Sequence, residues 1–168
     1  MTKPELRQQI CCFTGHRNVP KKDIDQILNR IETLVYALAE KGVTSFCVGG
    51  AIGFDTIAAQ HLLYLREIKG LNIRVILICP FDGFTNRWNQ TQKDEFAILL
   101  SHFDEVIYKE KTGCREAYLS RNRELVDRSA YCIAYCTRNY GGTAYTVRYA
   151  MKSGVTVLNI ADTDVDIF

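Results

Sequence analysis

The chain has 168 residues, is 47% hydrophobic and 24% charged, and carries a formal net charge of +2. The length suits one domain, and the composition supports a hydrophobic core and excludes a disordered chain. A net charge so close to zero argues against a dedicated nucleic-acid-binding protein, which usually shows a strong basic excess.

Strands and helices are predicted to alternate along the chain. Short apolar runs predict strands at residues 10–14, 44–48, 73–79, 104–108, 131–136 and 155–160, the third of them closed by Pro80. Amphipathic stretches predict helices at residues 23–41, 54–68, 90–102, 114–128 and 141–152. The acidic tail at residues 162–168 is expected to be frayed.

Continuous apolar strands joined by helices indicate a mostly parallel sheet that is covered on both faces. We therefore predict an α/β fold, Rossmann-like and doubly wound, with helices on both faces of the sheet. The sequence shows no linker and no internal repeat, so we expect a single domain over residues 1–168 with its core at about 10–160.

Two features bear on where the protein works. No apolar run reaches the roughly 18 residues that a membrane-spanning helix needs, and residues 1–9 are polar, unlike a signal peptide. We expect a cytoplasmic protein with no membrane partner. Most of the seven cysteines lie within apolar runs, so buried reduced thiols are expected and no metal site is assigned.

Glycine recurs where the predicted strands end, at the edge of the sheet where such folds bind ligands. Two of these glycine loops run into helix N-termini, whose free N–H groups and dipole attract phosphate. The residues that follow the strands predict a site for a nucleotide or another phosphorylated small molecule, the alternative being simple tight turns. The candidate residues are Gly15, His16, Arg17, Gly49, Gly50, Gly53, Asp55, Pro80, Phe81, Gly141, Gly142 and Thr143.

Several side chains have two interpretations each. Asp55 is either the N-cap of its helix or a contact to a ribose or base, and Arg17 either binds phosphate or belongs to a surface turn. Arg121, with Arg123 nearby, is either a ligand contact or part of a solvated helix face. Trp88, the only tryptophan, is either a stacking platform for a base or a staple between its loop and the next helix.

Three segments resemble known proteins. Residues 120–123 (SRNR), the strand that follows, and Gly142 with Thr143 resemble the closing half of the Rossmann-like domain of the DNA-processing protein A (Smf) family. Residues 48–55 (VGGAIGFD) are similar to the SGxAxGID segment of that family. Residues 12–17 (CFTGHR) look more like the YpsA-like proteins, a small bacterial family of unknown function.

These families belong to the SLOG superfamily, which also holds the lonely-guy phosphoribohydrolases. The resemblance spans about residues 10–160 and implies a Rossmann-like fold with a nucleotide-type ligand near the glycine loops. It points to eight of the candidates: Gly15, Arg17, Gly50, Gly53, Asp55, Arg121, Gly142 and Thr143.

The sequence differs from the phosphoribohydrolases at one position that matters for catalysis. The phosphoribohydrolases carry a catalytic glutamate three residues after the threonine of their glycine-threonine turn, and this chain has Thr146 there. Cleavage of an N-glycosidic bond needs a carboxylate, which here would have to come from elsewhere, such as Asp55 or Asp82. Asp55 and Arg121 are therefore the catalytic candidates, and whether the protein is an enzyme stays open.

Three functions follow from these observations. The leading hypothesis is a sensor or binding module for a nucleotide-derived ligand, with no required cofactor. The alternatives are a nucleotide N-ribohydrolase or related transferase, and a single-stranded DNA-binding protein that uses Trp88, Arg115, Arg121 and Arg123. A homodimer is also expected, with an interface formed by exposed Tyr118, Tyr140 and Tyr145.

Overall fold

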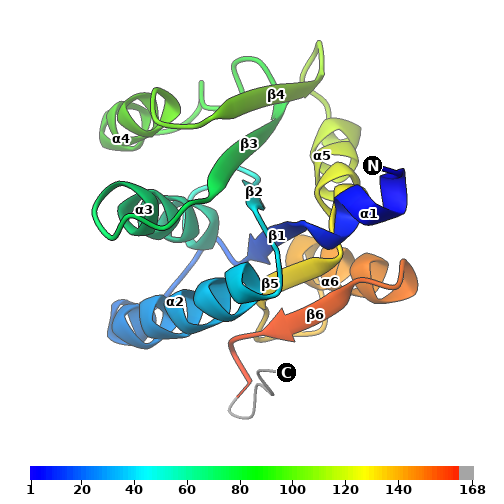
Figure 1. Ribbon diagram of the computed structural model, residues 1–168. Helices are drawn as coiled ribbons and strands as arrows, with labels where there is room; N and C mark the ends of the chain where they lie inside the picture. Colours follow the sequence, from blue (N-terminus) through cyan, green and yellow to red (C-terminus); the bar gives the residue numbers. More distant parts are fainter. Residues whose placement is uncertain (163–168) are drawn as a thin grey trace.

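A six-stranded parallel sheet forms the centre of the computed structural model, which describes residues 1–162 (Figure 1). The spatial order of the strands is β4-β3-β2-β1-β5-β6. The strands are β1 (Ile10–Gly15), β2 (Ser45–Val48), β3 (Arg74–Phe81), β4 (Glu105–Glu110), β5 (Tyr131–Tyr135) and β6 (Thr156–Asn159). Every pairing is parallel, so the predicted doubly wound α/β fold is confirmed.

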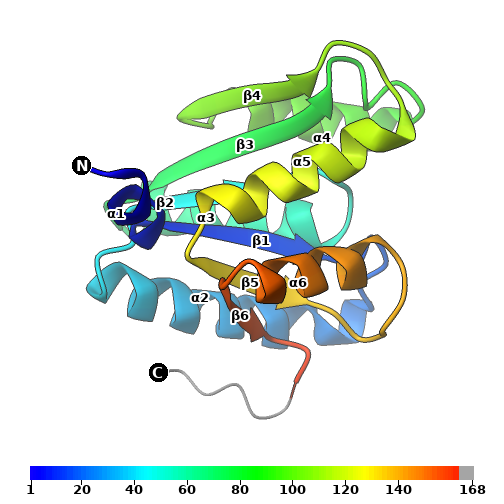
Figure 2. The same ribbon diagram turned by 90° about the vertical axis from the view of Figure 1, so that its right-hand side faces the viewer.

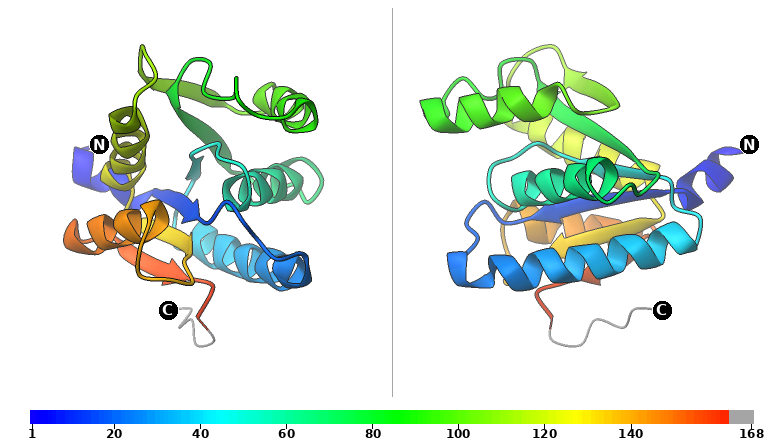
Figure 3. Two further views of the ribbon diagram at one scale, coloured as in Figure 1. Left: turned by 180° about the vertical axis from the view of Figure 1, so that it is seen from behind. Right: turned by 60° about the vertical axis from the view of Figure 1, so that its left-hand side comes forward.

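Helices cover both faces of the sheet, as Figures 1 and 3 show from opposite sides. One face carries α2 (Ile24–Glu40), α3 (Phe54–Glu67) and α4 (Gln90–Leu100). The other face carries α5 (Arg115–Arg128) and α6 (Gly142–Lys152), which lie in front of the strands in Figure 2. The strand order reverses between β1 and β5, so the loops that follow these two strands diverge to opposite faces.

The alternation of side chains along the strands divides the core into two layers. Phe13 on β1 packs with Phe46 and Phe54 beneath α2 and α3. The next residue towards the N-terminus, Cys12, faces α5 and α6 and lies in register with Cys47 and Cys132 on the two neighbouring strands. Burial raises the pKa of the Cys47 thiol to about 12, which keeps it protonated and unreactive.

All seven cysteines are free thiols, and five of them are buried. The five buried thiols agree with the expectation that most of the cysteines are buried and reduced. The two exceptions are Cys114, which is exposed, and Cys136, which is half-buried.

Two elements differ from the sequence-based expectation. Residues 1–9 include a short helix, α1 (Lys3–Gln8), which begins with a capping box between Thr2 and Glu5. Strand β3 does not end before Pro80 but continues to Phe81, which pairs with β4. Proline is tolerated there because β2 ends opposite Leu77, so no strand on that side needs an N–H from Pro80.

Two further expectations concern the C-terminal tail and membrane-spanning helices. The predicted frayed tail lies, from residue 163 onward, outside the described residues. Within the described part of the chain, no helix is long and apolar enough to cross a membrane.

The contact between the end of β1 and α3 gives a stability prediction. A Cβ at Gly15 would overlap the Cβ, Cγ and Cδ1 atoms of Phe54, a side chain that is fully buried and cannot rotate away. We expect Gly15→Ala to lower the free energy of unfolding by about 1–3 kcal/mol, measured by urea denaturation. Gly142→Ala is the control, because a Cβ there meets no atom within 4 Å. Equal stability of the two variants would contradict the prediction.

Candidate ligand-binding cleft

A cleft of about 530 Å³ opens at the carboxyl ends of β1 and β5. The loop after β1 and the loop after β2 form one wall, and α5 with the first turn of α6 forms the other. This is the place where the strand order reverses, and open α/β sheets bind their ligands in such a crevice. The strand order alone therefore predicts a ligand-binding crevice at this position.

The charged side chains that line the cleft are strongly unbalanced. They are four arginines and one carboxylate: Arg17, Arg115, Arg121, Arg138 and Asp55. Arg17 and Arg115 are exposed and make no hydrogen bond or salt bridge within residues 1–162. Arg138 lies over the ring of Tyr140, 5.0 Å from its centroid. The cleft thus presents cations whose hydrogen-bonding groups remain available to an anion.

The floor of the cleft holds a buried pair of opposite charges. The Arg121 side chain rises from α5, is only 5% exposed, and donates a hydrogen bond to the carbonyl of Gly49. Its Nε also donates to the Asn122 side chain at 2.8 Å. Asp55 reaches the same place from α3, where its Oδ2 accepts from the Ala51 N–H at 3.2 Å. A Cβ on Gly49 would lie 2.9 Å from Arg121 and 3.0 Å from Asp55, so both side chains close over this glycine.

Burial controls the protonation of this pair. It raises the pKa of Asp55 to about 6, and the nearby Arg121 charge and the Ala51 N–H limit the rise. Burial also lowers the pKa of Arg121, which Asp55 partly offsets. A carboxyl with a pKa near neutrality, inside a cleft, is a frequent feature of functional sites.

His16 has a structural role at the edge of the cleft. Its Nε2 accepts a hydrogen bond from the Thr137 N–H at 2.8 Å, and its ring packs edge-on against Tyr135. Burial, together with the Arg138 charge, lowers the pKa of His16, which favours the neutral ring. His16 therefore fixes the loop after β1 to the loop after β5.

The first turn of α6 presents unpaired backbone donors to the cleft. Its N-cap is Gly141, with a φ of 90° and no capping side chain. The N–H groups of Gly142 and Thr143 have no backbone acceptor within the part of the chain that the structure describes. Thr146 points away from the cleft, because its hydroxyl donates to the Gly142 carbonyl at 2.9 Å and the residue is 1% exposed.

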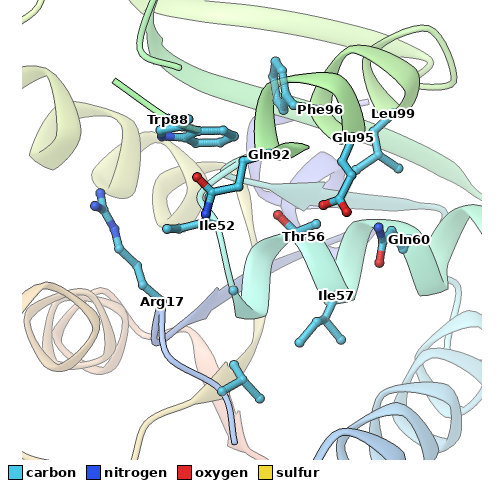
Figure 4. Close-up of a pocket in the computed structure, with 12 residues that line it drawn as sticks. Arg17, Ile52, Thr56, Ile57, Gln60, Trp88, Gln92, Glu95, Phe96 and Leu99 are labelled. Carbon is cyan, nitrogen blue, oxygen red and sulfur yellow. The ribbon is translucent and has the colours of Figure 1, made fainter. Parts of the chain in front are cut away.

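Two further cavities adjoin the cleft and share Arg17 with it. One, of about 390 Å³, lies between Arg121 and Trp88, and the other, of about 330 Å³, lies between α3 and α4. Figure 4 shows the second of these, with the Trp88 indole above Ile52 and the Arg17 side chain extended to one side. Trp88 meets Phe84 and Phe96 edge-to-face at 5.5 and 5.6 Å, as the staple interpretation expects, and its role as a stacking platform stays a prediction.

The structure brings most of the predicted site residues together. Those that line the cleft are Gly15, His16, Arg17, Asp55, Arg121, Gly142 and Thr143. Gly53 and Trp88 line the adjoining cavities, and Gly49, Gly50 and Gly141 shape the loops without lining any of the three. Pro80 and Phe81 are not brought to the site, because the Phe81 ring packs instead against Tyr118 and Phe84.

The structure excludes one of the two interpretations of Arg121 and of Asp55, and the exposure expected for two tyrosines is wrong. Arg121 does not belong to a solvated helix face, since α5 turns it inward beneath Gly49. Asp55 is not the N-cap of α3, because Gly53 holds that position and Asp55 caps the preceding loop through Ala51. Tyr118 and Tyr145 are half-buried rather than exposed, and the homodimer stays a prediction.

Arg138 and Tyr118 are among the residues that line the cleft and that sequence reasoning did not select for the site. Arg138 lies in the loop after β5, so the rule that selected the other strand ends also applies to it. Tyr118 lies three residues before Arg121 on α5, and that helical spacing places the two on the same face. Among residues 1–162, no group of three or more His, Cys, Asp or Glu side chains is placed to hold a metal ion.

Comparison with known proteins places these features in a family. Residues 11–159 match the model of the YpsA family, described as the YspA SLOG family. An uncharacterized SPbeta prophage-derived protein YoqJ of Bacillus subtilis is 27% identical over 141 residues, 77% of this chain and 80% of its own length. A UPF0398 protein of Bacillus velezensis is 24% identical over 158 residues, 86% of this chain and 84% of its own.

Two solved structures share the fold. DNA processing protein A (DprA) from Streptococcus pneumoniae superposes with a TM-score of 0.68 at 18% identity over 94% of this chain. DNA processing protein A from Helicobacter pylori, described with a single-stranded DNA binding mode, superposes with a TM-score of 0.62 at 19% identity over 90% of this chain. This chain covers 52% and 64% of those two proteins, so the likeness concerns only a part of each.

The raised pKa of Asp55 predicts a pH dependence of stability. The Asp55 carboxyl binds its proton more tightly in the folded protein than in the unfolded chain, where the pKa of an aspartate is about 4. The carboxyl therefore contributes most to stability below about pH 4, and the contribution is lost as pH rises through about 6. We expect the free energy of unfolding of the wild type, minus that of Asp55→Asn, to fall across this window in urea titrations. A difference that does not vary with pH would contradict the assignment.

Proposed function

The chain belongs to the YspA SLOG family, and from this premise we propose that it binds a nucleotide or a similar phosphorylated small molecule in the cleft at the carboxyl ends of β1 and β5. The observation that carries the proposal is the excess of arginine in that cleft, four guanidinium groups against one carboxylate. In a protein whose net charge is only +2, such a concentration favours an anionic ligand.

The phosphate would lie between the arginines and the first turn of α6. The Gly142 and Thr143 N–H groups and the Thr143 hydroxyl supply donors, and the helix dipole adds positive potential. Arg17 and Arg138 lie on the two loops that the strand reversal separates, so they would hold the phosphate from both sides. Asp55, the one carboxylate of the cleft, would accept hydrogen bonds from ribose hydroxyls.

Binding without turnover is the leading form of the proposal. Thr146 has no carboxyl group and does not line the cleft, so this position offers no acid to a ligand there. Asp82 is exposed and lines none of the three cavities. This leaves Asp55 as the one carboxylate that could act on a ligand in the cleft.

A nucleotide N-ribohydrolase is the second candidate, and one observation favours it. Asp55 has a pKa of about 6 and lines the cleft beside Arg121, as a general acid or base requires. Release of free base from a nucleoside monophosphate, abolished in Asp55→Asn, is the result that would establish turnover. Intact nucleotide after prolonged incubation supports binding alone.

Single-stranded DNA is the third candidate ligand. The fold is shared with DNA processing protein A, and the Helicobacter protein is described with a single-stranded DNA binding mode. Arg115 and Arg121 line the cleft, but Arg123 pairs with Glu116 and hydrogen-bonds Tyr145 at 3.3 Å, which makes it less available to a phosphate. A phosphate contact of any kind would make the affinity fall with rising salt.

The proposal is tested with inorganic pyrophosphate, measured by isothermal titration calorimetry. We expect the wild type to bind it and Arg17→Gln to bind about tenfold more weakly, since a charge-assisted contact is removed. Arg17 is exposed and its side chain makes no hydrogen bond or salt bridge within residues 1–162, so its replacement should not disturb the fold.

Arg74→Gln is the matched control. Arg74 is exposed, begins β3 at the opposite edge of the sheet, and pairs only with Glu105 at 3.6 Å among the described residues. Its replacement should leave pyrophosphate affinity unchanged. Equal affinities for the two variants, or no binding by the wild type, would overturn the proposed site.

A further inference from the structure

The cavity between α3 and α4 lies outside the phosphate site but is linked to it by shared lining residues. It measures about 330 Å³ and shares Arg17 and Trp88 with the middle cavity of about 390 Å³. The middle cavity in turn shares Arg121 and Tyr118 with the cleft. The three cavities therefore adjoin one another between the first turn of α6 and α4.

Apolar side chains form part of the walls of this outer cavity. Ile57 from α3 and Leu99 from α4 lie on opposite sides, and Phe96 and Trp88 close one end. Trp88 cannot swing freely, since its indole packs edge-to-face on both Phe84 and Phe96. Such walls favour the flat face of a ring over an extended flexible chain.

The rim of the same cavity is polar and unsatisfied. Glu95 and Gln60 are exposed, and neither side chain makes a hydrogen bond or ion pair with another residue in 1–162. The Gln92 Oε1 accepts from the Asn89 N–H at 3.2 Å, which leaves its NH₂ group free to donate. Figure 4 shows Gln92 beneath the indole, and Glu95 and Gln60 further along the cavity.

The charges distinguish this cavity from the cleft. Its lining includes one arginine and one carboxylate, Arg17 and Glu95, so their charges balance. A second phosphate would face Glu95 and be repelled. An uncharged ring with apolar faces and a polar edge meets both the walls and the rim.

We propose that this outer cavity binds the heterocyclic base of a nucleotide, with Trp88 against the ring and Glu95 accepting from an amino group on its edge. The inference rests on the proposed function, because the phosphate of the same nucleotide occupies the arginine-rich cleft. It gives that site a preference for amino-bearing bases, adenine, guanine or cytosine, over a bare sugar phosphate. A carboxylate is the acceptor best matched to such N–H donors.

The experiment compares ribose 5-phosphate with AMP, GMP and CMP as titrants. Trp88 is the only tryptophan of the chain, so its fluorescence reports a ring that arrives at this cavity. We expect the nucleotides to bind about tenfold more tightly than ribose 5-phosphate, the range that base stacking supplies, and to alter the emission. Ribose 5-phosphate should bind and leave the emission unchanged.

Two variants on α4 test the role of the carboxylate. Glu95→Gln removes the charged acceptor and should weaken binding of at least one of these nucleotides about tenfold, while leaving ribose 5-phosphate affinity unchanged. Asp94→Asn is the matched control, because it removes the same charge from the adjacent residue, which lines none of the three cavities. It should leave every affinity unchanged.

The possible outcomes distinguish a failure of the proposed base site from a failure of the proposed phosphate site. If neither ribose 5-phosphate nor any nucleotide binds, the phosphate site itself is wrong. If ribose 5-phosphate binds as tightly as all three nucleotides, or if Glu95→Gln behaves as Asp94→Asn does, the cleft stands and the base site is wrong.

Discussion

A buried guanidinium joins three separate segments of the chain at the carboxyl edge of the sheet. Arg121 comes from α5, the carbonyl that it binds belongs to Gly49 after β2, and the nearby carboxylate is Asp55 on α3. A buried charge without such partners costs several kcal/mol, roughly, so the three segments are held in one arrangement. Gly49 has no side chain because Arg121 and Asp55 occupy the space where a Cβ would point.

The parallel topology then determines what this edge can bind. Reversal of the strand order between β1 and β5 opens a cleft, and His16 links the two diverging loops through Thr137. The cleft is rich in arginine, whereas the adjoining cavity beyond Trp88 has balanced charges and combines apolar with polar side chains. This change in chemistry from the cleft to the adjoining cavity fits a ligand with an anionic end and an uncharged ring.

The sequence predicted the fold and the position of the cleft because both depend on local patterns. Within residues 1–162, apolar runs and helical spacing located every strand and every helix except α1 and a one-turn 3-10 helix at Lys21–Asp23, and glycine marked several strand ends. Burial of individual polar side chains depends on contacts between distant segments, so the sequence left Arg121 open between a ligand contact and a solvated face, and the structure shows it buried beneath Gly49. The packing of Phe81 against Tyr118, which turns its ring away from the cleft, depends on a distant contact in the same way.

The central claim is that the first turn of α6 and the surrounding arginines bind a phosphoryl group. The most direct measurement is a two-dimensional ¹H–¹⁵N NMR titration of the labelled protein with inorganic pyrophosphate. The account predicts saturable shifts of the Gly142 and Thr143 amide resonances, whose N–H groups face the cleft without a backbone acceptor in the described chain. Unchanged Gly142 and Thr143 resonances, with no shifts or with shifts only at other residues, would contradict it.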